Sequence, residues 1–104
     1  KHENVSINIV EIKKGYARGG HYHKYDQMHF IISGKIEYFE KNIKTKKETR
    51  KIIEGSNPIL IPANTAHMFI ALEETLFLEY FSKEYHAVNY PKYRNIVKKL
   101  IRKN

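Results

Sequence analysis

The stretch HYHKYDQMHFIISG, His21–Gly34, contains three of the six histidines in this chain of 104 residues. Side chains alternate between the two faces of a strand, so His21 and His23 point the same way. A tight turn follows, and the next strand carries Gln27 and His29 on one face. If these two strands are antiparallel neighbours, His21, His23 and Gln27 reach a common point, with His29 one pleat deeper.

Strand-like runs recur along the chain, with turn signals at roughly ten-residue spacing. The expected strands cover residues 5–12, 27–33, 35–41, 46–54, 58–62, 66–72 and 75–81. Residues 14–20, KGYARGG, form either a turn or a strand with close backbone approaches. Ser33 and Gly34 are expected to form a hairpin turn between the second and third of these runs. The pattern predicts an all-β sandwich or barrel.

The C-terminal end has a different periodicity. Residues 91–102 predict an amphipathic helix with Pro91 in its first turn. Its apolar stripe consists of Tyr93, Ile96, Val97, Leu100 and Ile101. Its basic residues are expected to face water: Lys92, Arg94, Lys98, Lys99, Arg102 and Lys103. We interpret residues 1–104 as one domain, with a barrel at about residues 5–82 and a helix at about 91–102.

Composition narrows the classes of function. Cysteine is absent, which excludes disulfides, thiolate ligands and cysteine nucleophiles. No segment is apolar enough to span a bilayer and no signal peptide is visible, so we expect a cytoplasmic protein without a membrane partner. The net charge of +8 suits an anionic partner. Nucleic acid ranks last among such partners, because the basic runs lack interleaved exposed aromatics.

Clustered histidines have two readings. Neutral imidazole is a common ligand of transition metals, and three imidazoles with one oxygen ligand leave coordination positions open for chemistry. An isolated His-x-His pair is more often a surface or hydrogen-bonded histidine. His67, after the run IPANTA, is a further candidate ligand.

Two motifs together resemble those of the cupin superfamily. The first is His21-x-His23, three residues, Gln27, six residues and Gly34, and the second is GSNPILIPANTAH, residues 55–67. The resemblance covers about residues 15–81. It implies a cupin double-stranded β-helix, that is, a jelly-roll barrel, followed here by the short C-terminal helix. Three departures are visible: Gln27 replaces the usual glutamate, Asn64 replaces a glycine, and Ala71 stands where an asparagine often follows the last histidine.

The resemblance implies that His21, His23, Gln27 and His67 are the ligands of one divalent transition metal, such as Zn, Fe, Mn or Ni. Gln27 binds through a neutral carbonyl oxygen, so the metal keeps its full charge and is a stronger Lewis acid. The alternative is that Gln27 marks a lost or weakened metal site.

Other residues have proposed roles at the same site. His29 is the candidate general acid or base, with a hydrogen-bonded core histidine as the alternative. The candidate substrate-binding residues are Arg18, Tyr16, Phe69 and Tyr80. The short run RGGHYHK also resembles the start of cupin ketoisomerases that act on nucleotide-linked deoxysugars. His2 and His86 are not expected to be ligands.

The resemblance favours a metal-dependent enzyme that acts on a small oxygenated metabolite. A carbohydrate isomerase or epimerase is the first hypothesis, with an anionic sugar or nucleotide-sugar as the substrate. The alternatives are an Fe(II)-dependent dioxygenase and a non-catalytic module that senses a sugar or other metabolite. A homodimer is expected from the resemblance.

Overall fold

The structure is a computed structural model that describes residues 5–82 and 87–101. The strands, in chain order, are β1 (Val5–Ile12), β2 (Ala17–Tyr22), β3 (Gln27–Ser33), β4 (Lys35–Asn42), β5 (Glu48–Glu54), β6 (Asn57–Ile61), β7 (Thr65–Ala71), β8 (Thr75–Ser82) and β9 (Val88–Asn89). Helix α1 (Pro91–Ile101) follows. The expected strands are confirmed to within a residue or two, and the glycine-rich segment forms most of β2.

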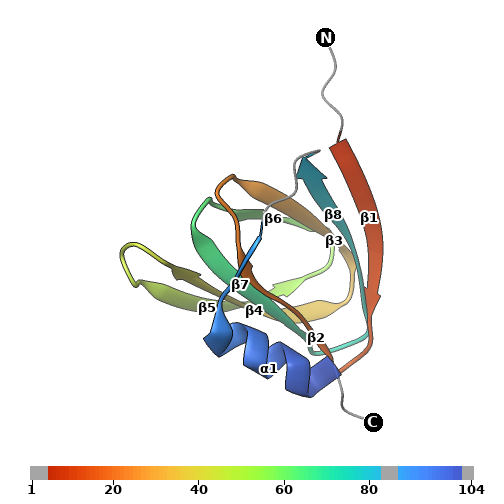
Figure 1. Cartoon of the computed structure of the whole chain (residues 1–104). Helices are drawn as coiled ribbons and strands as arrows, with labels where there is room; N and C mark the ends of the chain where they lie inside the picture. Colours follow the sequence, from red (N-terminus) through yellow and green to blue (C-terminus); the bar gives the residue numbers. More distant parts are fainter. Residues whose placement is uncertain (1–4, 83–86, 102–104) are drawn as a thin grey trace.

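The strands form two antiparallel sheets that face each other as a jelly-roll barrel (Figure 1). One sheet has the order β1-β8-β3-β6, and the other has the order β5-β4-β7-β2-β9. The all-β barrel with a C-terminal helix is therefore confirmed. No helix among the described residues is long and apolar enough to cross a membrane.

The expected hairpin at Ser33 and Gly34 is wrong. Strands β3 and β4 belong to different sheets, and the chain crosses from one to the other at Gly34. Gly34 has a φ of 106°, and a Cβ at this position would lie 2.5 Å from Thr75 Oγ1. Gly34 does mark the end of β3, but the hairpin partner of β4 is β5.

The expected pairing of the two histidine-bearing strands is also wrong. Strand β2 pairs with β7 and β9, whereas β3 pairs with β6 and β8. The two strands therefore face each other across the barrel interior. Their inward side chains still meet, because the inner faces of two packed sheets share one core.

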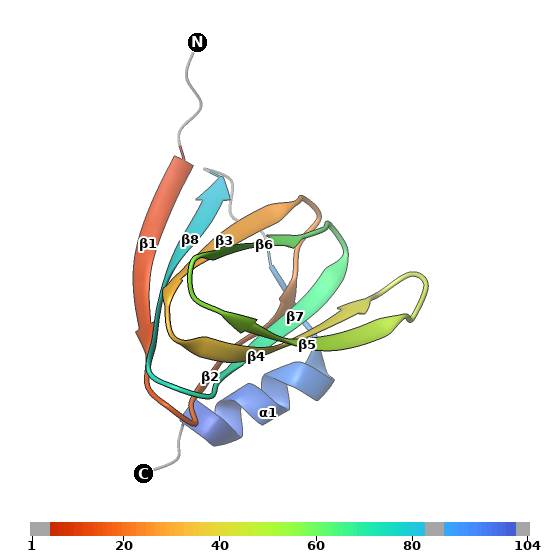
Figure 2. The ribbon, with the colours of Figure 1, turned by 180° about the vertical axis from the view of Figure 1, so that it is seen from behind.

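Two apolar cores lie on the two faces of the five-stranded sheet. The barrel interior holds Ile12, Ile31, Ile36, Tyr38, Ile59, Ile61, Phe69, Ala71 and Phe77. The second core is formed where α1 packs on the outside of β2 and β7, and it holds Ala17, Ala66, Met68, Tyr93 and Val97 (Figure 2). Strand β7 is thus covered on both faces. This explains its nearly continuous run of apolar residues.

Candidate functional site

A cavity of about 760 Å³ opens between the two sheets. Its polar wall comes from strands of both sheets and from the loop after β2. The polar residues of this wall include His21, His23, Gln27, His29, His67 and Glu79. The sequence predicted that the first five of these would meet, and the structure brings them to one cavity.

Strand pairing places two of the imidazoles side by side. His21 on β2 is the register partner of His67 on β7. His23 follows β2, and its ring centre lies 5.5 Å from that of His67. The backbone N–H of Asn64 donates to the His23 carbonyl at 2.7 Å, which ties the two loops together. Asn64 has a φ of 60°, the left-handed conformation that asparagine tolerates where the motif has glycine.

Gln27 is the first residue of β3 and lines the cavity. The sequence predicts its side-chain oxygen to be the oxygen ligand of the metal. Asp26 Oδ1 accepts a hydrogen bond from Ala63 N at 2.9 Å, which fixes the start of β3 against the loop before β7. The side-chain oxygen of Gln27 is buried and finds no hydrogen-bond partner among the described residues. A buried carbonyl oxygen without a partner is costly, so this atom has an unused capacity to bind a ligand.

Burial favours the neutral form of His21 and His67. Desolvation lowers the pKa of His67 to about 3, with a further contribution from nearby His29. The pKa of His21 is lowered by desolvation and then by the charge of Arg94. Only a neutral imidazole offers the free electron pair that a metal ion or a proton donor requires. These rings are therefore in the binding-competent form at neutral pH.

His29 lies deeper, between aromatic rings. Its side chain is 2% exposed, and it stacks on Phe77 with the ring centres 5.8 Å apart. Its Nε2 lies 3.8 Å from Glu79 Oε2, and its Nδ1 has no hydrogen-bond partner among the described residues. Desolvation lowers the pKa of His29, and the neighbouring Glu79 carboxylate opposes that effect.

Glu79 is a polar group of the cavity to which the sequence assigned no role. It lies on β8 between Phe77 and the end of the strand, on the inward face. Arg18 donates two hydrogen bonds to the Glu79 carboxylate, from Nε to Oε2 at 2.7 Å and from Nη2 to Oε1 at 3.0 Å. Burial disfavours the charge on Glu79, but the hydrogen bonds and charge of Arg18 outweigh it, so the pKa is lowered. The sequence signal for this role was the alternation of β8, because it places Glu79 on the same inward face as the apolar Phe77.

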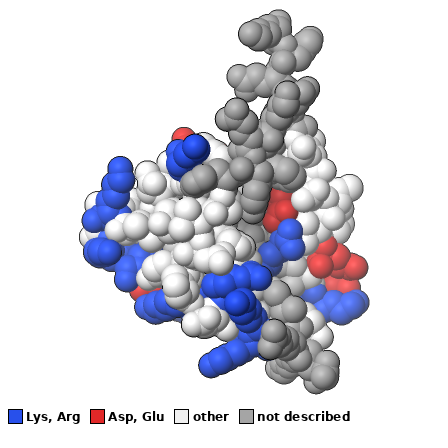
Figure 3. Space-filling view, in the orientation of Figure 1, with Lys and Arg blue, Asp and Glu red and all other residues white. Residues whose placement is uncertain are grey.

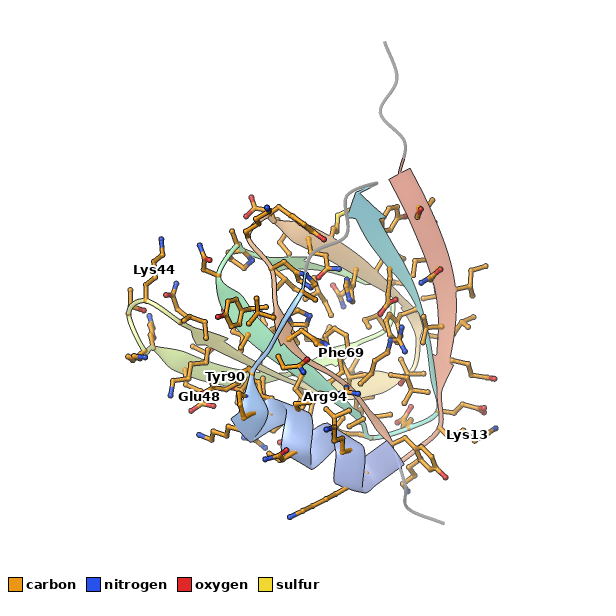
Figure 4. The ribbon with its side chains drawn as sticks, viewed as in Figure 1. Lys13, Lys44, Glu48, Phe69, Tyr90 and Arg94 are labelled. Atoms are coloured by element: carbon orange, nitrogen blue, oxygen red, sulfur yellow. The ribbon has the colours of Figure 1, made fainter. Side chains whose placement is uncertain are left out.

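Arg94 is a second residue that was missed, because it was expected on the water-facing side of the helix. It instead reaches from α1 toward the strands and lines the cavity (Figure 4). Its Nη1 donates to the Gly19 carbonyl at 3.0 Å. The helix can come this close because residue 20 is a glycine. A Cβ at this position would lie only 2.7 Å from Arg94 Cα. The glycine pair in β2 was the only sequence signal for this approach.

The predicted substrate-binding residues separate into two groups. Tyr16 and Phe69 line the cavity beside the histidines, and Arg18 also lines it while holding Glu79. Tyr80 follows Glu79 on β8, so it points to the opposite face and is not part of the cavity wall. His2 and His86 lie outside the described residues.

No protein-family model and no curated protein matches this sequence. Solved structures do match. Oxalate decarboxylase from Bacillus subtilis is 21% identical with a TM-score of 0.73, over 84% of this chain and 24% of that one. The formate complex of Lactobacillus farciminis oxalate decarboxylase is 22% identical with a TM-score of 0.73, over 90% and 29%. RmlC from Streptococcus suis, in complex with dTDP-D-xylose, is 20% identical with a TM-score of 0.65, over 81% and 46%.

The chain has the cupin fold. It spans less than half the length of each of these neighbours. At this identity the likeness concerns the fold, and many chemistries occur on one fold. What this chain does therefore has to be argued from its own cavity.

The cavity fits a metal ion in its chemistry but only in part in its geometry. Neutral imidazoles and an unpartnered amide oxygen are suitable ligands. Among the described residues, however, no three His, Cys, Asp or Glu side chains converge closely enough to hold a metal ion. His23 and His67 are close together, with ring centres 5.5 Å apart. His21 is less buried than either of them and lies near Arg94. Binding by the whole set would require the side chains to close in on a common point.

Proposed function

We propose that this cupin is a metal-dependent enzyme that acts on a small oxygenated metabolite, as a carbohydrate isomerase or epimerase. The observation that carries the proposal is the buried, unpartnered oxygen of Gln27 in the same wall as His23 and His67. The ligand set would be His21, His23, Gln27 and His67. Mn(II) centres are described for the B. subtilis oxalate decarboxylase, which shares the fold.

A divalent metal bound by these side chains would polarise a carbonyl or hydroxyl oxygen of the substrate. The protein's own residues supply the remaining functions. His29 is neutral and lines the cavity, so its imidazole is suited to take a proton from a substrate carbon and to return it. Glu79 is a positioning residue, because its carboxylate lies beside His29 Nε2 and would stabilise the ring once it is protonated. Arg18 in turn keeps Glu79 ionised and in place.

The proposed substrate is an anionic sugar or a nucleotide-sugar. Arg94 and Lys13 belong to the cavity wall and bring positive charge to it. Arg18 is paired with Glu79, and Lys13 Nζ lies 3.5 Å from Glu74 Oε2, whereas Arg94 donates to the Gly19 carbonyl. Arg94 would therefore contribute most to the attraction of an anionic ligand. Lys and Arg side chains also gather on the surface around α1 and the β4–β5 hairpin (Figure 3). RmlC, which has the same fold, was solved with dTDP-D-xylose.

The first test is metal content, measured by mass spectrometry on protein purified without an affinity tag. We expect near-stoichiometric metal in the wild type, or after reconstitution with zinc, iron, manganese or nickel. The variant His23→Ala/His67→Ala should lose it, whereas the control His2→Ala/His86→Ala should keep it. Isomerisation assays with and without oxygen then separate an isomerase from a dioxygenase. A wild type that takes up none of these metals would contradict the metal-dependent enzyme.

One observation favours a second candidate, a non-catalytic module that binds a sugar or another metabolite. The histidines line an open cavity without converging as a metal site within the described residues. Neutral imidazoles, Gln27 and Arg94 would then be hydrogen-bond partners for an organic ligand. Sugar or nucleotide-sugar binding by metal-free protein, without turnover and unaffected by added metal, would favour this candidate.

A further inference from the structure

A second cavity, of about 460 Å³, lies outside the barrel between α1 and the hairpin of β4 and β5 (Figure 2). Strands β4 and β7 form its floor, and α1 and β5 form its walls. Its apolar lining consists of Phe39, Met68, Ile70, Tyr93 and Ile96, and its charged residues are Glu48, Arg50 and Lys92. None of these residues lines the cavity that holds the histidines. We call the two cavities the outer pocket and the histidine cavity.

Strand register and the position of the helix together form the outer pocket. Phe39 on β4 is the register partner of Met68 on β7 and of Arg50 on β5, so these side chains lie in one row on the outward face of the sheet. Helix α1 packs on β2 and β7. It buries Met68, which is 1% exposed, but it leaves Phe39 and Ile70 only partly buried. The row is therefore covered at one end and open at the other.

The size and lining of the outer pocket are those of a small-molecule site. Such sites have volumes of about 300–1,000 Å³ and combine an apolar lining with a few polar groups. The rings of Phe39 and Tyr93, with centres 6.3 Å apart, and the thioether of Met68 favour contact with a flat apolar group. The apolar part of the lining therefore suits an aromatic ring or a short hydrocarbon chain.

The charged residues at the rim favour an anion over a cation. Both carboxylate oxygens of Glu48 are already engaged, since Oε2 accepts a hydrogen bond from the Tyr93 hydroxyl and Oε1 lies 3.4 Å from Lys92 Nζ. Arg50 donates from Nε to Glu37, and among the described residues its two terminal nitrogens have no partner. The Arg50 side chain is 60% exposed, and a guanidinium binds a carboxylate through two parallel hydrogen bonds. The rim thus offers a carboxylate site beside an apolar floor.

We propose that the outer pocket binds a small hydrophobic carboxylic acid. Its apolar body lies over Phe39 and Ile70, and its carboxylate pairs with the terminal nitrogens of Arg50. The net charge of +8 adds a general attraction for such an anion. This site is separate from the histidine cavity, and binding there does not depend on the proposed enzymatic function.

Occupation of the outer pocket would also hold α1 in place. The helix lines both cavities, with Tyr93 and Ile96 in the outer pocket and Arg94 and Val97 in the histidine cavity. A ligand that contacts the docked helix stabilises the docked state by mass action. Hydrogen exchange in α1 should therefore slow when the outer pocket is filled, and Arg94 is held at the wall of the histidine cavity.

The test uses 1-naphthoate as the probe, titrated into the whole chain by isothermal titration calorimetry and by ¹H–¹⁵N nuclear magnetic resonance. We expect saturable one-to-one binding with a dissociation constant of about 1 mM or tighter. The shifted amide signals should include those of β4, β5, β7 and α1. The uncharged 1-naphthylmethanol should bind about tenfold more weakly, because it cannot pair with the guanidinium.

The variant that tests the carboxylate site is Arg50→Gln. We expect it to weaken 1-naphthoate binding about tenfold and to leave 1-naphthylmethanol binding unchanged. Since Arg50 is largely exposed, the variant should keep the wild-type circular dichroism spectrum. The matched control is Lys51→Gln, which removes one positive charge from the same strand but lies outside the outer pocket. It should bind 1-naphthoate as the wild type does.

Three results would overturn the proposal. The first is the absence of saturable 1-naphthoate binding to the wild type. The second is a set of amide shifts confined to the histidine cavity or to the four-stranded sheet. The third is equal 1-naphthoate affinity in Arg50→Gln and Lys51→Gln, which would mean that net charge, and not contact with Arg50, attracts the probe.

Discussion

At the scale of single residues, Gln27 decides how strongly the cavity holds a cation. Its carbonyl oxygen is neutral, and burial lowers the pKa of His67 in the same wall to about 3, so that imidazole is neutral as well. Gln27→Glu would place a carboxylate at the same position, and opposite charge favours metal binding. We expect the dissociation constant for Mn²⁺ or Zn²⁺ to fall by about tenfold or more. Isothermal titration calorimetry measures this change.

The matched control for that prediction is Gln27→Leu, which has a similar shape but no oxygen. We expect it to bind metal more weakly than the wild type. It should fold at least as well, because it removes a buried polar atom that has no partner among the described residues. Equal metal affinity in all three proteins would mean that Gln27 is not a ligand.

The pair formed by Arg18 and Glu79 leads to a second prediction at this scale. Glu79 is mostly buried, so removing Arg18 leaves a carboxylate with a reduced set of partners. Arg18→Met should destabilise the protein by about 1–2 kcal/mol at neutral pH, since the guanidinium is itself partly exposed. Urea unfolding measures the effect.

The double variant Arg18→Met/Glu79→Gln is the control for this pair, because it removes the charge that lost its partner. We expect it to recover part of the stability lost in Arg18→Met. Glu79→Gln alone completes the comparison. If the loss of stability in the double variant equals the sum of the losses in Arg18→Met and Glu79→Gln, the interaction between Arg18 and Glu79 contributes nothing to stability. Asn8, which lies 3.5 Å from Glu79 Oε1, stays unchanged throughout.

At the scale of elements, the glycine pair of β2 explains how the barrel and helix fit together. Gly19 and Gly20 have φ values of 110° and 95°. A Cβ on Gly19 would lie 2.8 Å from the carbonyl oxygen of His67, and one on Gly20 would meet the backbone of Arg94. The first glycine thus lets β2 approach β7, and the second lets α1 approach β2.

Gly20→Ala should therefore destabilise the docking of α1. We expect a loss of about 2 kcal/mol or more, because alanine is strained at this φ and its Cβ collides with the helix backbone. Hydrogen exchange should quicken first in α1. Gly55→Ala is the control: its nearest contact is 3.1 Å, to Ser33 Cα, so we expect a smaller loss. Equal losses in both variants would contradict this account of Gly20.

At the scale of the whole molecule, the buried histidines make stability depend on pH. The pKa of His67 falls from 6.5 to about 3 on folding, and that of His29 is lowered too. The unfolded chain then binds more protons than the folded one below pH 6.5. Stability is therefore full above that pH and is lost as the pH falls toward 3. The lowered pKa of Glu79 adds a further loss below its ordinary value of 4.5.

We expect metal-free protein to lose about 3 kcal/mol of stability through His67 alone between about pH 6.5 and about pH 4. Chemical unfolding after treatment with EDTA, repeated across this range, measures the loss. His67→Gln should flatten the dependence, because its side chain does not titrate. A wild-type stability that is constant over this range would contradict the neutral, buried state of the ring.

Much of the fold was predictable because its signals are local. Strand alternation has a period of two, so it placed Gln27 and His29 on one face without any knowledge of the partner strand. Turn residues marked the ends of strands, and the spacing of apolar residues marked α1. The two motifs brought His21, His23, Gln27 and His67 into one candidate site, and all four belong to the cavity wall.

The sequence by itself determined seven of the strands, the helix and the shared face of Gln27 and His29. The tertiary structure alone decided which strands pair, and so it corrected the hairpin at Gly34 and the pairing of β2 with β3. It also decided that Arg94 reaches the cavity and that Arg18 holds Glu79. The reason is physical: alternation acts between neighbours in sequence, whereas pairing and packing join residues far apart in the chain.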